Sequence, residues 1–244
     1  SVGSFYGYQT ADYVFASTED AAKAGKEHVN SEGKTTTNLY IVDEAGHKID
    51  FVAGDTHFID QNGDGEINEQ DKVIIGNPNP DFYGNIFATL NWKRFTLNVG
   101  FNYCVGNDIY NYQRSVLNSG STLYNQQVAE IGHWRYEGQI TELPRLYYGD
   151  PMGNNRFSDR WIEDGSYLRL KTLSLSYNVP VPESWQSWLQ GLSVWGECRN
   201  LFTITRYTGN DPELSVSNHQ LYQGIDGGNI AQGRSFTLGV KVNL

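Results

Sequence analysis

The sequence predicts an all-β protein, an antiparallel transmembrane β-barrel segment with about six strands and long extracellular loops. Several stretches alternate apolar and polar residues with a period of two, as half-buried or lipid-facing strands do. Short links alternate with long polar excursions along the chain, which is typical of membrane barrels. Aromatic residues make up 14% of the 244 residues, and several of them close the apolar faces of the expected strands.

Composition narrows the possible functions. The net charge is −10, from 18 basic and 28 acidic residues, and so we expect no nucleic-acid partner, because phosphate contacts need clustered Lys and Arg. No apolar run is long enough for a transmembrane helix. Cys104 and Cys198 each lie in a strand-like run. The sequence leaves their pairing open, and two small residues that are buried or lipid-facing are the simpler expectation.

The first part of the chain predicts one β-prone stretch and a long loop. Residues 4–15 are rich in aromatic side chains. Ser17, followed by Glu19 and Asp20, has the pattern of a helix start, and the helix should end near Lys26. The rest of 16–80 reads as a long loop with a short strand at 38–42.

Residues 81–106 predict a hairpin of two strands. A tight turn at Lys93 and Arg94 separates two strictly alternating runs. Trp92 and Tyr103 end the apolar face, as interfacial aromatics do in membrane barrels. The residues that share this face are Ile86, Ala88, Leu90, Trp92, Phe95, Leu97, Val99, Phe101 and Tyr103.

The second half predicts three more strands and two long loops within one barrel segment that spans 1–244. Residues 107–159 form a long polar loop, and 160–207 form a strand pair. Its first strand, 161–177, should contain a bulge, because the apolar alternation breaks among Tyr167, Leu168, Leu170, Leu173 and Leu175. Residues 208–232 form another long loop, and 233–244 form a terminal strand with clean alternation.

Residues 60–71 have the layout of a calcium-binding loop. Oxygen-bearing side chains recur at alternating positions, and Gly65 stands where such a loop turns sharply. The last position is Asp71 rather than the usual Glu, and no long helices flank the loop, so we expect a structural Ca²⁺ ion. The alternative is a metal-free turn rich in Asn, Asp and Gly. The expected ligands are Asp60, Asn62, Asp64, Glu66 and Asp71.

A set of motifs spread over nearly the whole chain resembles the C-terminal part of SusC/RagA-type TonB-dependent outer-membrane transporters. Each motif is modest alone, but their order is specific. They are GSFYGY (3–8), GD (54–55) before DQNGDG (60–65), IGNPNPDF (75–82), WIEDGSYLRL (161–170), RNLFT (199–203), DPE (211–213) and RSFTLG (234–239).

This resemblance implies a segment of a plugged barrel of ~22 strands in the outer membrane of a Gram-negative bacterium. About six strands leave two open edges, which hydrocarbon does not tolerate, so we expect the chain to pair with the remaining N-terminal plug and barrel segment. The implied partners are TonB (through that missing part), a SusD-like surface lipoprotein, outer-membrane lipid and an oligosaccharide or peptide substrate. Leu244 departs from the aromatic residue that commonly ends such barrels.

Five aromatic residues in 107–159 are candidates for contact with the substrate or with the lipoprotein lid: Tyr124, Trp134, Tyr136, Tyr147 and Tyr148. The alternative is that they pack the loops against one another. A different function class also fits the sequence, a secreted soluble β-sandwich that binds carbohydrate and is stabilised by calcium. We expect no enzyme, because the chain lacks a nucleophile elbow and an HExxH motif, and its five His residues are scattered. The sequence does not identify the substrate.

Overall fold

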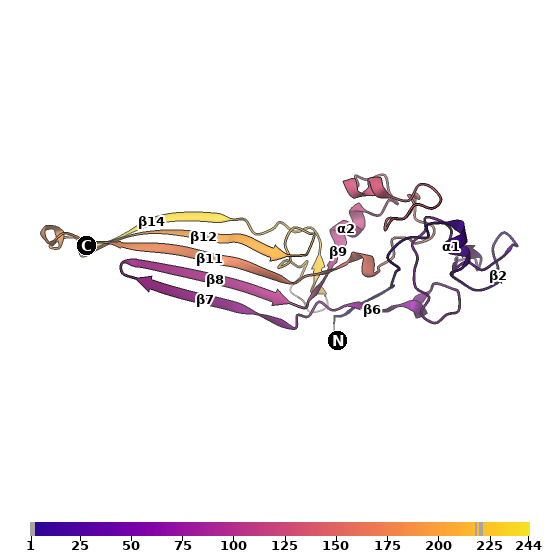
Figure 1. Ribbon diagram of the computed structural model, residues 1–244, viewed down its shortest axis with the longest axis horizontal. Coiled ribbons are helices and arrows are strands. Elements are labelled where there is room, and N and C mark those ends of the chain that lie inside the picture. Colours follow the sequence, from indigo (N-terminus) through magenta and orange to yellow (C-terminus); the bar gives the residue numbers. More distant parts are fainter. Residues whose placement is uncertain (1–2, 218, 220–221) are drawn as a thin grey trace.

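The computed structural model describes residues 3–217, 219 and 222–244, and these form an elongated molecule with a sheet at one end and packed loops at the other (Figure 1). The sheet is antiparallel, with strand order β14-β12-β11-β8-β7. Its strands are β7 (Phe82–Trp92), β8 (Phe95–Val105), β11 (Tyr167–Val179), β12 (Gly191–Thr205) and β14 (Ser235–Asn243). Strands β7 and β14 are its two edges.

One face of this sheet is apolar across all five strands, because the register aligns residues of the same parity. One row runs through Leu90, Leu97, Leu175, Gly196 and Leu238. Leu90, Leu175 and Leu238 of this row are exposed, Leu238 by 88%, whereas Leu97 is half-buried. The neighbouring row on the opposite face is Thr89, Asn98, Ser174, Glu197 and Thr237. The predicted alternation of the hairpin and of the terminal strand is therefore confirmed.

Two local features predicted for the sheet are confirmed. The β7–β8 turn consists of Lys93 and Arg94, and Lys93 has the positive φ of 55° that such a tight turn requires. A bulge interrupts the β11–β12 register between Leu170 and Thr172. The broken apolar alternation marks this position because an extra residue reverses the side-chain parity.

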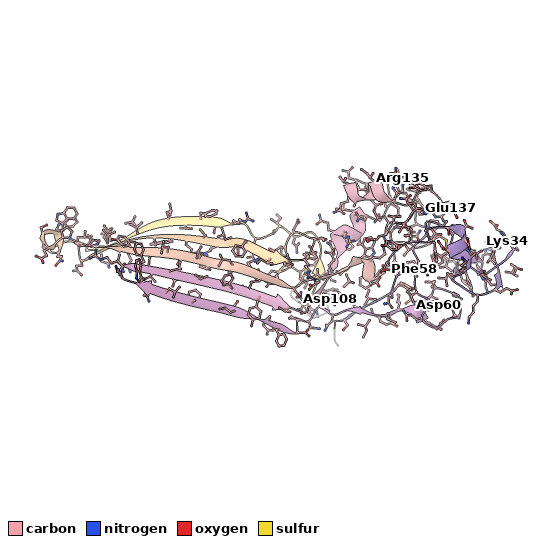
Figure 2. The ribbon with its side chains drawn as sticks, in the orientation of Figure 1. Lys34, Phe58, Asp60, Asp108, Arg135 and Glu137 are labelled. Carbon is pink, nitrogen blue, oxygen red and sulfur yellow. The ribbon has the colours of Figure 1, made fainter. Side chains whose placement is uncertain are left out.

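The loop end has its own hydrophobic core. A short sheet of β1 (Phe5–Gly7) and β6 (Val73–Gly76) leads into it, followed by α1 (Thr18–Ala22) and two small hairpins. Phe58 and Asp60 lie at this end, far from the long strands, whereas Asp108 lies at the junction (Figure 2). The core consists of Tyr8, Phe15, Ala21, Leu39, Ile41, Phe51, Phe58, Ile67 and Met152.

The remaining elements are short. The hairpins are β2 (His28–Val29) with β3 (Thr35–Thr36), and β4 (Tyr40–Val42) with β5 (Lys48–Asp50). A three-stranded sheet joins β10 (Ile162–Asp164), β9 (Asp108–Asn111) and β13 (Ile225–Asp226). The short helices are η1 (Glu69–Asp71), α2 (Tyr112–Leu117), η2 (Val128–Gly132), η3 (Asp159–Trp161) and η4 (Glu183–Trp185).

Several element boundaries in the structure differ from the predicted ones. Helix α1 begins as expected, with Ser17 Oγ accepting from Asp20 N at 3.1 Å, but it ends at Ala22 instead of Lys26, because the Gly25 N–H donates to the Thr37 carbonyl. The aromatic stretch 4–15 contributes only β1, which pairs with β6, so the long sheet has five strands rather than about six. The predicted strand beginning at 161 is split, because β10 leaves the sheet to pair with β9.

Both cysteines are free thiols, Cys104 in β8 and Cys198 in β12. Among the residues described here, no helix combines the length and the apolar character needed to cross a membrane.

Candidate functional site

Buried ion pairs fasten the 208–232 loop to the sheet. Arg169 of β11 donates to Asp211 and, at 2.6 Å, to Glu213, while its Nε donates to Thr203 Oγ1 at 2.8 Å. Lys171 adds a 3.1 Å ion pair with Glu213. Burial alone would raise the pKa of Asp211, but hydrogen bonds from Arg169 and from two backbone N–H groups hold that pKa below its usual value. Ion pairs therefore hold the part of this loop around Asp211 and Glu213 against the sheet.

The predicted calcium loop is folded by turns of its own side chains. Asp60 accepts from the N–H groups of Gly63 and Gly65 at 2.6 and 2.7 Å. Asp71 is fully buried and accepts from Gln61 N at 3.0 Å and Asn68 N at 2.8 Å. Gly65 has a φ of 90°, which explains why glycine stands at the sharp turn. Two further predicted ligands, Asn62 and Asp64, bond one another through side chain and backbone.

Two observations bear on whether the oxygen atoms of this loop bind a cation. In its favour, no Lys, Arg or His in the described chain forms an ion pair with Asp60, Asp64, Glu66 or Asp71, so their charge is uncompensated. Against it, within residues 3–217, 219 and 222–244, no group of three or more His, Cys, Asp or Glu side chains is gathered as a metal site would need. Calcium would bind through oxygen lone pairs that the backbone N–H groups leave free. It stays a prediction.

The structure separates the five predicted aromatic contact residues into two groups. Tyr124 is 81% exposed, and Tyr136, Tyr147 and Tyr148 are also exposed. Trp134 is half-buried: its Nε1 donates to the Ala16 carbonyl at 3.1 Å and its ring covers Gly54. Four of the five side chains are thus available to a partner, and Trp134 mainly packs one part of the loop end against another.

A cavity of about 420 Å³ lies where five segments of the loop end meet. The segment 10–14 forms one wall, and Arg114 of α2, Arg160 and Trp161 of η3 form another. The Arg160 guanidinium lies 4.7 Å from the centre of the Trp161 ring, and the Arg114 guanidinium lies 5.9 Å from it. A second cavity of about 490 Å³ shares Arg114, Glu142 and Leu143 with the first, so the two lie side by side, and we call them together the cleft.

The charges around this cleft are unevenly compensated. Arg114 pairs with Glu163 at 3.0 Å, whereas Arg160 donates, among the residues that the structure describes, only to Thr56 Oγ1 and the Asn154 carbonyl, both neutral. Burial and the nearby charge of Arg114 lower the pKa of Arg160 to about 10. Burial also raises the pKa of Glu130 to about 7, against the opposing effect of Arg160.

Sequence comparison gives the family. TonB-dependent receptor P3 of Formosa agariphila is 34% identical to the chain over 77% of its length, and TonB-dependent receptor P26 of the same organism is 30% identical over 83%. TonB-dependent receptor SusC of Bacteroides thetaiotaomicron is 25% identical over 98% of the chain.

The chain belongs to the SusC/RagA-type TonB-dependent receptors.

The predicted resemblance to this receptor family is thereby confirmed. The chain spans about a fifth of the length of the curated receptors that it matches, 19% of receptor P3 and 22% of SusC. No family model matches the sequence.

Solved structures agree on the fold of this receptor segment. The structure of the RagAB peptide transporter matches 98% of the chain with a TM-score of 0.65 at 21% identity, and the chain covers 22% of it. The RagAB peptide importer in the open-open state matches 99% with a TM-score of 0.62. The predicted fold class, an antiparallel segment of a transmembrane β-barrel, is confirmed.

Sequence reasoning missed the cleft of this receptor segment. Arg114 and Arg160 lie in the long loop 107–159 or at its edge, and no spacing or motif relates them. The only local signal is the neighbouring pair Arg160 and Trp161, which is too common to indicate a site. The cleft arises from the way that α2 and η3 pack, and element packing cannot be read from short-range pattern.

Proposed function

We propose that this chain is part of an outer-membrane, TonB-dependent active importer of oligosaccharides or peptides in a Gram-negative bacterium. Its chemistry would be binding and gating rather than bond breaking. The observation that carries the proposal is the exposed apolar face that crosses all five long strands, in a chain whose relatives are TonB-dependent receptors. Such a face is costly in water but favourable against hydrocarbon.

The two open edges of the sheet support pairing with the remaining plug and barrel of the same receptor. Strands β7 and β14 each leave one row of backbone hydrogen-bonding groups without a strand partner among the residues described. Hydrocarbon does not tolerate such rows, so the missing strands of the receptor would complete them. TonB would act through that remaining part.

The exposed aromatics support a surface lipoprotein of the SusD type as a partner. Tyr124, Tyr136, Tyr147 and Tyr148 project from a loop end that is ordered by its own core. Tyrosine supplies contact area at low entropic cost and is enriched in interfaces. RagAB, whose structures resemble this chain, is a peptide transporter, which makes peptides as reasonable a substrate for this chain as oligosaccharides.

The alternative of a soluble β-sandwich is disfavoured by the same face. A sandwich needs a second sheet packed about 10 Å from the first. No other described element covers the apolar face, on which Leu238 of β14 is 88% exposed.

We also propose that the 60–71 loop binds one structural Ca²⁺ ion. Its support is the uncompensated charge of Asp60, Asp64, Glu66 and Asp71 and the preorganised turn around Gly65. The test is a calorimetric titration of the intact receptor with calcium, in which the wild type is compared with the Asp60→Asn variant. Binding that is absent from the wild type, or equal in both proteins, would reject the ion.

The decisive experiment for the import proposal uses the native membrane complex. The receptor is purified in detergent, its co-purifying polypeptides are identified by intact mass, and uptake of labelled oligosaccharide and peptide pools is measured in cells with and without TonB. We expect a plug-and-barrel chain, a lipoprotein and TonB-dependent uptake of one pool. A chain that is folded and monomeric without detergent would overturn the proposal.

A further inference from the structure

The cavity at the centre of the loop end is lined by Arg160, a cation that forms no ion pair within the described part of the chain. Arg160 is mostly buried, and it forms no ion pair with a carboxylate of the described residues. Only its Nη1 group donates hydrogen bonds within that part of the chain, to Thr56 and Asn154, so Nε and Nη2 are left for another acceptor. A mostly buried guanidinium whose charge is not neutralised is costly, which makes this position a natural place for an anionic ligand group.

The acidic side chains near Arg160 are committed elsewhere or lie at the rim. Asp159 accepts three hydrogen bonds from Thr10, two from its N–H and one from its hydroxyl. Asp12 and Glu142 line the cavity but are exposed. The cavity therefore has a cationic floor and an acidic, solvated rim.

Two further charged groups, Arg114 and Glu130, act on Arg160, and Glu130 compensates its charge only in part. The guanidinium of Arg114 lies over the same Trp161 ring as that of Arg160. Although Arg114 is paired with Glu163, it is a second positive charge on the floor of the cavity. Glu130 is buried, its Oε1 has no hydrogen-bond partner in the described chain, and burial raises its pKa to about 7, which weakens it as a counter-ion at neutral pH.

We propose that Arg160 binds a carboxylate group of the imported substrate in this cavity, which makes it a specificity-determining residue of the receptor. The inference rests on the proposed import function. A guanidinium presents two parallel N–H groups that match the two oxygens of a carboxylate. The cavity of about 420 Å³ accommodates the unit that carries the charge, and the adjoining cavity of about 490 Å³ accommodates its neighbour.

Two sources supply this chemistry, the carboxylate of a peptide and that of a uronic-acid oligosaccharide. The arms of the experiment distinguish them by pairing each acid with a neutral form. The probes are a short peptide with a free C-terminal carboxylate, the same peptide as its C-terminal amide, an oligogalacturonate and its methyl ester. Affinities are measured by calorimetry on the full receptor, purified in detergent with its co-purifying partners.

The variant is Arg160→Gln, with Arg135→Gln as the matched control. Arg135 is an exposed arginine at the outer edge of the same loop end (Figure 2), and within the described residues its side chain donates only to the Ile131 carbonyl and to His133. We expect Arg160→Gln to weaken one of the two acidic probes about 10- to 100-fold and to leave its neutral form unchanged. Arg135→Gln should change neither.

The outcomes separate this inference from the import function. If Arg160→Gln binds the acidic probes as the wild type does, or weakens acidic and neutral probes equally, the carboxylate site is wrong while TonB-dependent uptake can still stand. A wild type that binds neither acid more tightly than its neutral form also overturns it. Should Arg160→Gln fail to assemble, Arg160→Lys replaces it, because it keeps the charge but loses the paired N–H groups, and it should weaken the acidic probe severalfold.

Discussion

Replacing Arg169 by Met is expected to release the loop around residues 209–214 from the sheet. The Arg169 side chain is only 4% exposed, and its partner Asp211 is 2% exposed. Methionine has a similar length and fills much of the space of the arginine stem, so packing is largely preserved while the charge is lost. Asp211 would then be a buried carboxylate without a cation.

The magnitude follows from the burial of the two partners. Removing one side of a buried ion pair costs about 3–5 kcal/mol, because the other charge is left uncompensated. The Glu213 side chain is 25% exposed and keeps its 3.1 Å contact with Lys171, so its loss is smaller. We therefore expect the low end, about 3 kcal/mol, which corresponds to a roughly hundredfold increase in local opening.

Hydrogen exchange of the intact receptor in detergent measures this opening directly. The backbone N–H groups of Glu213 and Gln232 both donate to Asp211, so they report the state of the contact. The matched control is Arg199→Gln, because the Arg199 side chain is 65% exposed in its pair with Glu197 and such pairs contribute about 0–1 kcal/mol.

A rescue variant separates charge from packing. Adding Asp211→Asn to Arg169→Met removes the uncompensated charge and should restore part of the lost protection. The reasoning is refuted if Arg169→Met exchanges at the rate of Arg199→Gln, since the buried pair would then contribute no more than an exposed one.

Three further predictions concern the loop end. Burial raises the pKa of Glu130 to about 7, so the favourable contribution of the protonated carboxyl to folding stability is complete below about pH 4.5 and is lost as pH rises through about 7. Glu130→Gln should therefore abolish this pH dependence when stability is measured as resistance to proteolysis. An unchanged slope of resistance against pH would contradict the prediction. Gly54→Ala should cost about 1–3 kcal/mol, because φ is 85° and the added Cβ would lie 2.5 Å from the Trp134 ring; faster proteolytic cleavage of the loop checks it. Asp71→Asn should lower the thermal midpoint of calcium-free receptor, because a buried carboxylate that accepts from two N–H groups is lost, whereas exposed Asp64→Asn should change it little.

Short-range patterns were sufficient for the hairpin and the terminal strand of the sheet, but not for its strand count or for the split after Trp161. Each strand of the hairpin alternates over many residues, and such alternation has one structural solution when one face meets an apolar environment and the other does not. The turn at Lys93 and Arg94 and the bulge near Leu170 also leave local marks, a polar pair between apolar runs and a parity break. These features depend on neighbours in sequence, and so they were predictable.

The loop end was predictable only in part. Ser17 marks the start of α1 because its cap is made within three residues, but the end of the helix depends on a hydrogen bond from Gly25 to Thr37. Trp134 looks like an exposed contact residue in sequence, yet its indole is held by Ala16 and Gly54. Sequence distance hides such contacts, because they form only when several loops pack at once.

By itself, the sequence determined the long alternating strands, their faces, the calcium-type turn and the receptor family. These features depend on the local spacing of residues or on the order of motifs. Only the tertiary structure decided which charges meet. It brings Arg169 to Asp211, and it places Arg160 beside Arg114 with no ion pair to a carboxylate of the described residues. The physical reason is that a charge pair depends on the positions of two distant loops, and no residue pattern within either loop specifies the other.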